Sequence, residues 1–398
     1  MCKSRNINGK GTTYKDEARD IWVYQISYTD PETRELKRKK FSAKVKKVAV
    51  KKGDEFLSNL EKGLLPSSNE ITVGQWVETW LTDYCKQRVR PRTWEKYKSS
   101  LECYVLAKFK NTFLRDLRSV DLQKHFNSLL ENGRLDGKPL SSSTVRGVRR
   151  YFTMCLDSAV KHGMVLKNIA RDTEPPKLTK KDIMVLNTEQ IEKLLIAAKN
   201  IDNNYMQDVL PVVLKLALHT GMRQGEIFGL KWEDIDLAGN YIYIKRSLAY
   251  IVGKGYILQE PKTKTSRRKI LLMRDDIVML KEYKKWQEQH IDSVGDKYEN
   301  ASLVFANIYG KPIDTSNFTT RYLKPTLKMA GIDSSFTFHC FRHTHATILL
   351  KEKVNPKVIQ ERLGHSNISM TLDIYSHVLP DMQDEAIGAL NNIFGRKE

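Results

Sequence analysis

The chain has 398 residues, too many for one ordinary hydrophobic core, so two or three domains are expected. Lys and Arg number 67 against 47 Asp and Glu, a formal charge of +20, which indicates a polyanionic partner or, alternatively, only a charged soluble surface. The five cysteines are scattered and no apolar stretch is long enough for a signal or a membrane span, which argues against a disulfide framework, a zinc knuckle or a membrane protein.

Residues 1–68 predict a small basic unit made of a β-sheet and a helix. The alternating run Ile21–Tyr28 and the run Leu36–Phe41 flank a turn and predict a hairpin, and a helix is expected over about Ala43–Leu60. The second strand carries four consecutive basic residues, Lys37, Arg38, Lys39 and Lys40. Either these form a solvated face, or they enter a groove of DNA, and both interpretations are open.

Residues 71–172 predict an all-helical domain after a linker at Gly63–Asn69. Thr72 and Gln75 form a capping box, and the aromatic residues that follow it, including Trp76 and Trp80, have the helical spacing of a core stripe. Further helices are expected over Thr93–Val105, Ser119–Glu131 and Thr144–His162. Candidate phosphate contacts in this domain are Arg88, Arg90, Arg92, Lys96, Arg146, Arg149 and Arg150.

A proline- and lysine-rich stretch at 173–182 predicts a second linker before a third domain, residues 183–398. A capping box of Asn187 and Gln190 opens a helix through Ala198, and a longer helix ends at Gly221. Three short strands are expected, followed by a helical tail beyond Ser316. The expected strands are Tyr241–Lys245, Tyr256–Gln259 and Lys269–Met273. The whole chain is thus expected to be multidomain and mainly α, with small β-sheets.

Five short motifs follow one another in the third domain. In order they are Thr220–Glu226, Pro261–Lys264, His339–Thr344, Leu363–His365 and Tyr375. Taken alone, Arg223 is more commonly an ion-pair partner at a helix end, and Lys262 an ordinary turn residue. His339 and Arg342 stand at i and i+3, so they share one helical face. A chance match is an unsatisfactory explanation because all five motifs occur together and in this order.

This set resembles the tyrosine recombinases, in particular the integrases of bacterial conjugative transposons and temperate phages. The resemblance covers the whole third domain and implies the α+β catalytic fold of that family. The helical domain is similar to the family's core-binding (SAM-like) domain, and residues 1–68 are similar to its small arm-binding sheets. Phe341 departs from the family pattern, because Leu is common there.

The resemblance implies a role for each motif residue. Arg223 and Arg342 would clamp the negative charge that develops on a phosphate in the transition state. Tyr375 would attack that phosphate and leave a 3′-phosphotyrosine and a free 5′-hydroxyl. Lys262 would protonate the leaving oxygen. The remaining assignments are His339 and His365 as proton acceptors, Glu226 as support for the first arginine, and Lys264 as a DNA contact.

Because the covalent adduct retains the energy of the broken bond, neither a cofactor nor a metal is expected. The histidines at 339, 343 and 345 could indicate a metal site, but Arg342, which lies between them, would repel a cation. Gly253–Gly255 lacks the spacing of a phosphate-binding P-loop. The chain is expected to act in the bacterial cytoplasm, on nucleoid DNA.

The expected partners are duplex DNA, at core and arm attachment sites, and three further copies of the chain in a tetramer that passes through a Holliday junction. A DNA-bending or excision factor is a further candidate partner. The C-terminal segment, about 381–394, is expected to be a helix that docks either on its own domain or on a neighbouring protomer. Two other functions are considered: a type IB topoisomerase, which shares this chemistry, and an inactive architectural DNA-binding relative.

Overall fold

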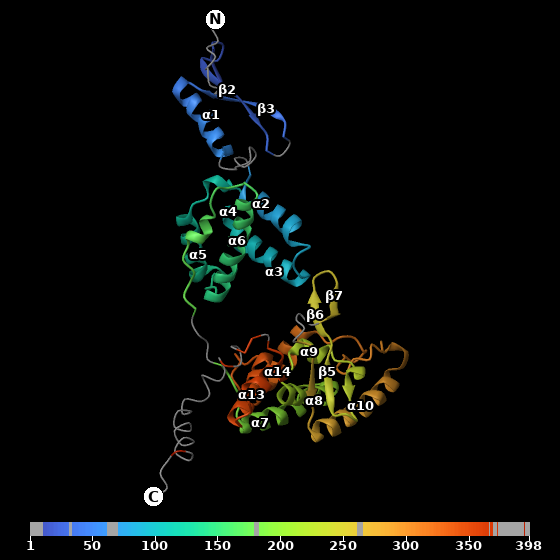
Figure 1. Cartoon of the computed structure of the whole chain (residues 1–398). Helices are drawn as coiled ribbons and strands as arrows, with labels where there is room; N and C mark the ends of the chain where they lie inside the picture. The colour runs from blue at the N-terminus through green and yellow to red at the C-terminus, as the bar shows by residue number, and fades with distance from the viewer. Residues whose placement is uncertain are drawn as a thin grey trace. The chain divides into compact units, whose positions relative to one another are not determined.

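The computed structural model describes residues 11–31, 34–61, 71–178, 183–260 and 266–365, together with positions 367, 368, 372 and 394. The chain divides into two compact units, Met1–Lys180 and Lys181–Glu398. Helices dominate both units and the sheets are small (Figure 1), so the predicted fold class is confirmed. The boundary between the units falls inside the predicted linker at 173–182.

The N-terminal part of the first unit is a three-stranded antiparallel sheet with one helix packed against it (Figure 1). Its elements are β1 (Thr12–Asp16), β2 (Ile21–Thr29), β3 (Leu36–Ala43) and α1 (Lys46–Glu61). Tyr24, Ile26, Ala49 and Phe56 form its buried core. The predicted hairpin and helix are confirmed. The structure adds β1, whose sequence has one large apolar residue and which pairs along its whole length with β2.

The rest of the first unit is helical and begins at the predicted capping box. The Gln75 amide nitrogen donates to Thr72 Oγ1 at 3.2 Å, and the Thr72 nitrogen donates to Gln75 Oε1 at 2.9 Å. Trp76 and Trp80 are buried in one core, so the aromatic stripe is core as predicted. The helices are α2 (Val73–Thr79), a π-helix (Trp80–Cys85), α3 (Pro91–Leu101), a second π-helix (Glu102–Leu106), α4 (Ala107–Phe109), α5 (Ser119–Asn132) and α6 (Ser142–Lys161), with 3-10 turns at Leu114–Asp116 and Ile169–Asp172.

The first residues of the predicted second linker, Thr173 and Glu174, are hydrogen-bonded to the helical part. The Glu174 nitrogen donates to Gln123 Oε1 at 2.7 Å. Arg149 Nε donates to Thr173 Oγ1 at 2.8 Å. These bonds attach the first half of the segment to α5 and α6. The domain limits themselves stay a prediction.

The second unit contains helices around two small sheets (Figure 1). The helices are α7 (Thr188–Lys199), α8 (Asn204–Thr220), α9 (Gln224–Phe228), α10 (Arg274–Val294), α11 (Thr315–Asn317), a π-helix (Phe318–Leu323), α12 (Lys324–Met329), α13 (Phe338–Lys351) and α14 (Pro356–Leu363), with 3-10 turns at Trp232–Asp234 and Gly295–Lys297. The strands are β4 (Ile235–Asp236), β5 (Tyr241–Ile244), β6 (Ser247–Ile251), β7 (Gly255–Gln259) and β8 (Arg268–Leu271).

The strands pair as β4-β5-β8 and as a separate hairpin, β6-β7. The three predicted strands exist, but the second belongs to the hairpin and not to the sheet of the other two. The structure also adds β6 and the long helix α10, which are not among the predicted elements. Among the described residues, no helix combines the length and apolar character needed to cross a membrane.

Candidate functional site

Arg223 is positioned by the end of α8. Gly221 ends that helix in the left-handed region, with φ +62°, and a Cβ on it would lie 2.5 Å from Leu363 Cδ2. Arg223 then adopts an extended conformation as the residue before α9. Its nitrogen donates to Glu226 Oε2 at 2.9 Å and its Nη1 donates to Glu226 Oε1 at 2.7 Å, while Nη2 donates to the Gly364 carbonyl at 3.2 Å.

Glu226 is buried between two arginines. Arg268 meets it with a fork, in which Nη1 donates to Oε1 at 3.1 Å and Nη2 to Oε2 at 2.9 Å. Burial alone would raise the pKa of Glu226, but the hydrogen bonds and charge of Arg268, and then Arg223, outweigh it and lower the pKa to about 2. Glu226 is therefore a carboxylate at neutral pH. Arg268 is a further site residue and lies outside the five sequence motifs.

Arg342 lies on α13 with only 2% of its surface exposed. Its Nη1 donates to the Gly221 carbonyl at 2.9 Å, its Nη2 to the Leu363 carbonyl at 2.7 Å and its Nε to His365 Nε2 at 3.2 Å. Burial, and then the positive charges of two neighbouring arginines, lower the pKa of Arg342 to about 9. The guanidinium is still protonated at neutral pH, so it places a buried positive charge in the site.

His365 and His339 border this guanidinium as neutral rings. His365 is buried and its Nε2 accepts the hydrogen bond from Arg342. Burial, and then the charges of Arg342 and Arg223, lower the pKa of His365 to about 3. His339 is more exposed than His365, yet partial loss of solvation, the neighbouring His343 and the same arginines lower its pKa to about 4. Both rings are therefore neutral at neutral pH, and in His365 the acceptor nitrogen Nε2 is already used by Arg342.

His345, the third histidine of α13, has a structural role. It hydrogen-bonds the Leu218 carbonyl through Nδ1 at 2.7 Å, and its Nε2 accepts from Arg362 Nε at 3.2 Å. Arg362 Nη2 also donates to the His219 carbonyl at 3.0 Å, which links α14 to the end of α8. Within the described ranges, no three His, Cys, Asp or Glu side chains are grouped as metal ligands.

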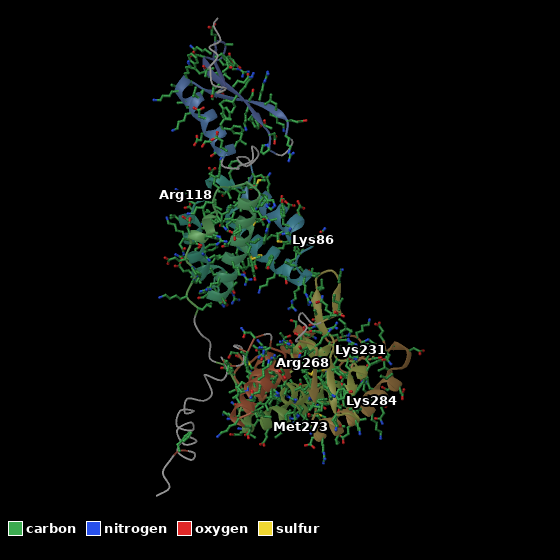
Figure 2. All side chains as sticks on the ribbon, viewed as in Figure 1. Lys86, Arg118, Lys231, Arg268, Met273 and Lys284 are labelled. Carbon is green, nitrogen blue, oxygen red and sulfur yellow. The ribbon has the colours of Figure 1, made fainter. Side chains whose placement is uncertain are left out.

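The structure thus gathers five of the predicted site residues, namely Arg223, Glu226, His339, Arg342 and His365. Lys262, Lys264 and Tyr375 lie outside the described residues, as does most of the C-terminal segment predicted to dock. Figure 2 labels Arg268 in the second unit, to which the five gathered residues also belong. The sequence feature that indicates burial of Arg268 is strand alternation, because Arg268 and Ile270 lie on the same buried face of β8.

The basic run of β3 is divided between the two faces of its strand. Lys37 pairs with Asp30 at 2.6 Å, and Lys39 lies 4.7 Å from the ring centroid of Phe56, so both belong to the face that α1 covers. Arg38 and Lys40 alternate with them and are exposed on the opposite face. Two of the four predicted DNA contacts therefore point to the open face of the sheet.

Four of the predicted phosphate contacts in the helical part line one hollow of about 700 Å³. They are Lys96, Arg146, Arg149 and Arg150. Arg146 Nη1 donates to the Pro176 carbonyl at 2.9 Å, and Arg149 is bound to Thr173, so these two guanidiniums also hold the chain beyond α6. The other predicted residues, Arg88, Arg90 and Arg92, are exposed at the start of α3 and just before it.

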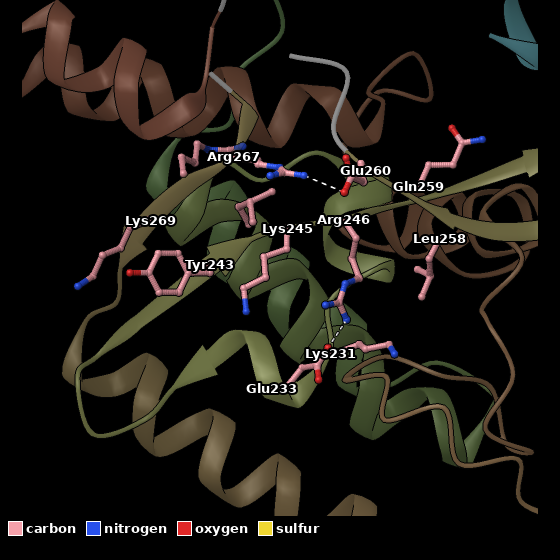
Figure 3. A pocket seen from close by; sticks show the side chains of 12 residues that line it. Lys231, Glu233, Tyr243, Lys245, Arg246, Leu258, Gln259, Glu260, Arg267 and Lys269 are labelled. Carbon is pink, nitrogen blue, oxygen red and sulfur yellow. Dashed lines mark ion pairs between the residues drawn. The ribbon is translucent and has the colours of Figure 1, made fainter. Parts of the chain in front are cut away.

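A second basic hollow, of about 770 Å³, lies beside β5 and β8 (Figure 3). Its basic lining residues are Lys231, Lys245, Arg246, Arg267, Arg268 and Lys269. Arg246 pairs with Glu233 at 2.7 Å and Arg267 pairs with Glu260 at 2.8 Å, as the dashed lines in Figure 3 show. The lining residues are dispersed in the sequence, which is why no local motif indicates this surface.

Two family models match the chain. The model described as the phage integrase family matches residues 184–382, and that of the phage integrase N-terminal SAM-like domain matches residues 72–130. A tyrosine recombinase XerC-like protein of Caldanaerobacter subterraneus subsp. tengcongensis is 31% identical over 97% of this chain and 99% of its own length. The ICEBs1 integrase of Bacillus subtilis is 23% identical over 93% of this chain and 97% of its own.

Solved structures share the fold. The Tn1549 transposon integrase, in complex with transposon right end DNA, has a TM-score of 0.67 at 22% identity and covers 81% of this chain and 99% of its own. A lambda integrase tetramer bound to a Holliday junction has a TM-score of 0.56 at 18% identity and covers 93% of this chain and 96% of its own.

Proposed function

The chain belongs to the phage integrase family of tyrosine recombinases, which makes it a DNA breaking-and-rejoining enzyme of the mobile-element integrase type, and we propose that it works through Tyr375. In this proposal Tyr375 attacks a phosphate of one DNA strand, so that a 3′-phosphotyrosine forms and a 5′-hydroxyl leaves. The supporting observation is the pair of guanidiniums, Arg223 and Arg342, that both bind the end of α14.

The described side chains suit an in-line phosphoryl transfer. Two guanidiniums stabilise the charge on the non-bridging oxygens, His339 accepts the proton of the phenol, and His365, whose Nε2 already accepts from Arg342, braces the phosphate. Lys262 protonates the departing 5′-oxygen. Because the ester linkage is conserved through the adduct, rejoining is the same transfer in reverse and consumes no nucleotide.

For partners, we propose duplex DNA at a core site, which the catalytic unit and the helical part hold, and at an arm site, which the open face of the N-terminal sheet holds. Each of the two basic hollows offers phosphate contacts within its own unit. Four protomers assemble and pass through a Holliday junction, with a DNA-bending factor as accessory. The enzyme then works on the bacterial nucleoid. A topoisomerase is not favoured, since the relatives reported above are recombinases and integrases.

Trapping the covalent intermediate tests this proposal. The full-length protein is incubated with a nicked suicide duplex that carries the host element's end, and the adduct is digested and mapped by mass spectrometry. We expect the DNA on Tyr375, no adduct with Tyr375→Phe, and an undiminished yield in EDTA. Tight DNA binding without any adduct would favour the architectural alternative, and inhibition by EDTA would reveal a required metal.

A further inference from the structure

Arg268 is buried at the junction of the sheet and the catalytic motifs. It is the first residue of β8, where it pairs with Ile244 of β5, and its side chain is 5% exposed. A buried arginine is uncommon because removing its charge from water is costly unless all of it is paired. The hydrogen-bond partners of the Arg268 guanidinium therefore indicate its role.

The guanidinium of Arg268 connects two separate elements. Its two terminal nitrogens fork onto the carboxylate of Glu226 in α9, at 2.9 and 3.1 Å. Its Nε donates to the carbonyl of Arg362 near the end of α14 at 2.7 Å, and Nη1 also donates to the Ser266 carbonyl at 3.2 Å. One planar group thus fixes the position of α9 relative to the end of α14.

Both connected elements hold the arginines of the proposed phosphate clamp. Glu226 binds Arg223 through its side chain and backbone. The two carbonyls that follow Arg362 in the chain, those of Leu363 and Gly364, accept from Arg342 and Arg223 respectively. A shift of α14 against α9 would therefore change the spacing of the two guanidiniums.

We propose that Arg268 is a positioning residue that sets the separation of Arg223 and Arg342 by joining Glu226 to the end of α14. This inference rests on the proposed phosphotyrosine chemistry. Although Arg268 borders the basic hollow beside β5 and β8, its side chain is 5% exposed and its fork is bound to Glu226, so it contributes to the rate of strand cleavage and not to DNA affinity. Lysine cannot replace it, because an ammonium is a single point charge without the fork that reaches both partners.

The test is single-turnover cleavage of the suicide duplex by full-length Arg268→Lys. The amplitude reports the folded, competent fraction, and the rate constant reports the geometry of the site. We expect affinity close to wild type and a rate constant lower by roughly 10- to 100-fold, the scale of small misplacements in active sites. The matched control is Arg171→Lys, which removes a similar fork onto Asp157 at an exposed site and should leave the rate constant unchanged.

A wild-type rate constant for Arg268→Lys overturns the inference, as does a loss confined to the amplitude. If Arg268→Lys gives no measurable cleavage amplitude, a second comparison is made. The double variant Glu226→Gln/Arg268→Gln is then compared with the single variant Glu226→Gln. Equal rate constants support the inference, because breaking either end breaks one connection, and a further slowing in the double variant overturns it. Absence of any adduct with the wild-type protein would instead refute the proposed function.

Discussion

At the scale of single residues, the described part of the site carries more positive charge than the buried carboxylate of Glu226 can balance. Arg223, Arg268 and Arg342 surround Glu226, and the lowered pKa of Arg342 reflects burial and this mutual repulsion. A phosphate between Arg223 and Arg342 would supply the missing negative charge. In the proposed function this excess positive charge is a preorganised anion site, which is the arrangement expected to stabilise a phosphoryl-transfer transition state.

Because the pKa of Glu226 is lowered in the folded protein, the free energy of unfolding should decrease at acid pH. Its pKa is about 2 in the folded protein against 4.5 ordinarily, so it contributes about 3 kcal/mol above pH 4.5, which is lost as the pH falls toward 2. Glu226→Gln should abolish that part of the pH dependence. Urea unfolding of both proteins between pH 6 and pH 3 measures it.

The control for this experiment is Glu233→Gln, which removes an exposed carboxylate paired with Arg246. It should leave the decrease at acid pH as in the wild type. If Glu226→Gln keeps the full wild-type pH dependence, the account of this carboxylate is wrong.

The proposed catalytic arginines and histidines are indicated only by the order of their motifs, and of the residues that hold them the motifs include Glu226 but not Arg268. Nothing in the pair Arg267-Arg268 distinguishes the exposed residue from the buried one until the strand that contains Ile270 is placed. Arg362 is missed for a similar reason, since its contacts with His345 and His219 join segments far apart in the chain. Long-range hydrogen bonds of this kind leave no local signal.

At the scale of elements, strand alternation separates two roles within the basic run of β3. Replacing Arg38 and Lys40 with alanine should weaken DNA binding and lower the slope of log affinity against log salt by about 2, because two phosphate contacts are lost. Titration of labelled arm-site DNA with the full-length protein over a range of salt measures this slope.

The matched double variant replaces Lys37 and Lys39, which have the same charge but face α1. It should change the salt slope less and destabilise the sheet more. Equal slopes for the two double variants would mean that the run is only a solvated face, the alternative left open by the sequence.

Local signals predict helix starts better than they predict strand partners. Both capping boxes, at Thr72 and at Asn187, are present with their expected partners. The sequence of α10 shows only a weak amphipathic pattern, because two of its buried positions are polar, Asp276 and Gln287. The Gln287 amide donates to the carbonyls of Leu303 and Val304, so its burial is satisfied by a distant segment.

At the scale of the whole molecule, separate hydrophobic cores support separate functions. The sheet of β1–β3, the helical part and the catalytic unit each have their own cluster of buried residues. Composition and linker signals predict this organisation, since they depend on the average properties of long segments. The limits at 68, 172 and 183 remain predictions.

Deleting residues 1–68 should therefore leave the remaining chain folded. We expect cleavage of core-site suicide DNA to be retained and binding of arm-site DNA to be lost. Gel-shift and cleavage assays on the truncated protein provide the measurement. Loss of all cleavage in a folded product would contradict the assignment of the N-terminal sheet to arm DNA.

The most direct test of the guanidinium clamp compares Arg223→Ala on two DNA duplexes, one with an ordinary scissile phosphate and one with an uncharged methylphosphonate there. Arg223 is partly exposed, so the variant is expected to fold. We predict a loss of cleavage rate of about 10²- to 10³-fold on the phosphate, by analogy with removal of an oxyanion donor. On the methylphosphonate the loss should be far smaller, because no negative charge remains to be clamped. An equal loss on both duplexes would contradict the account.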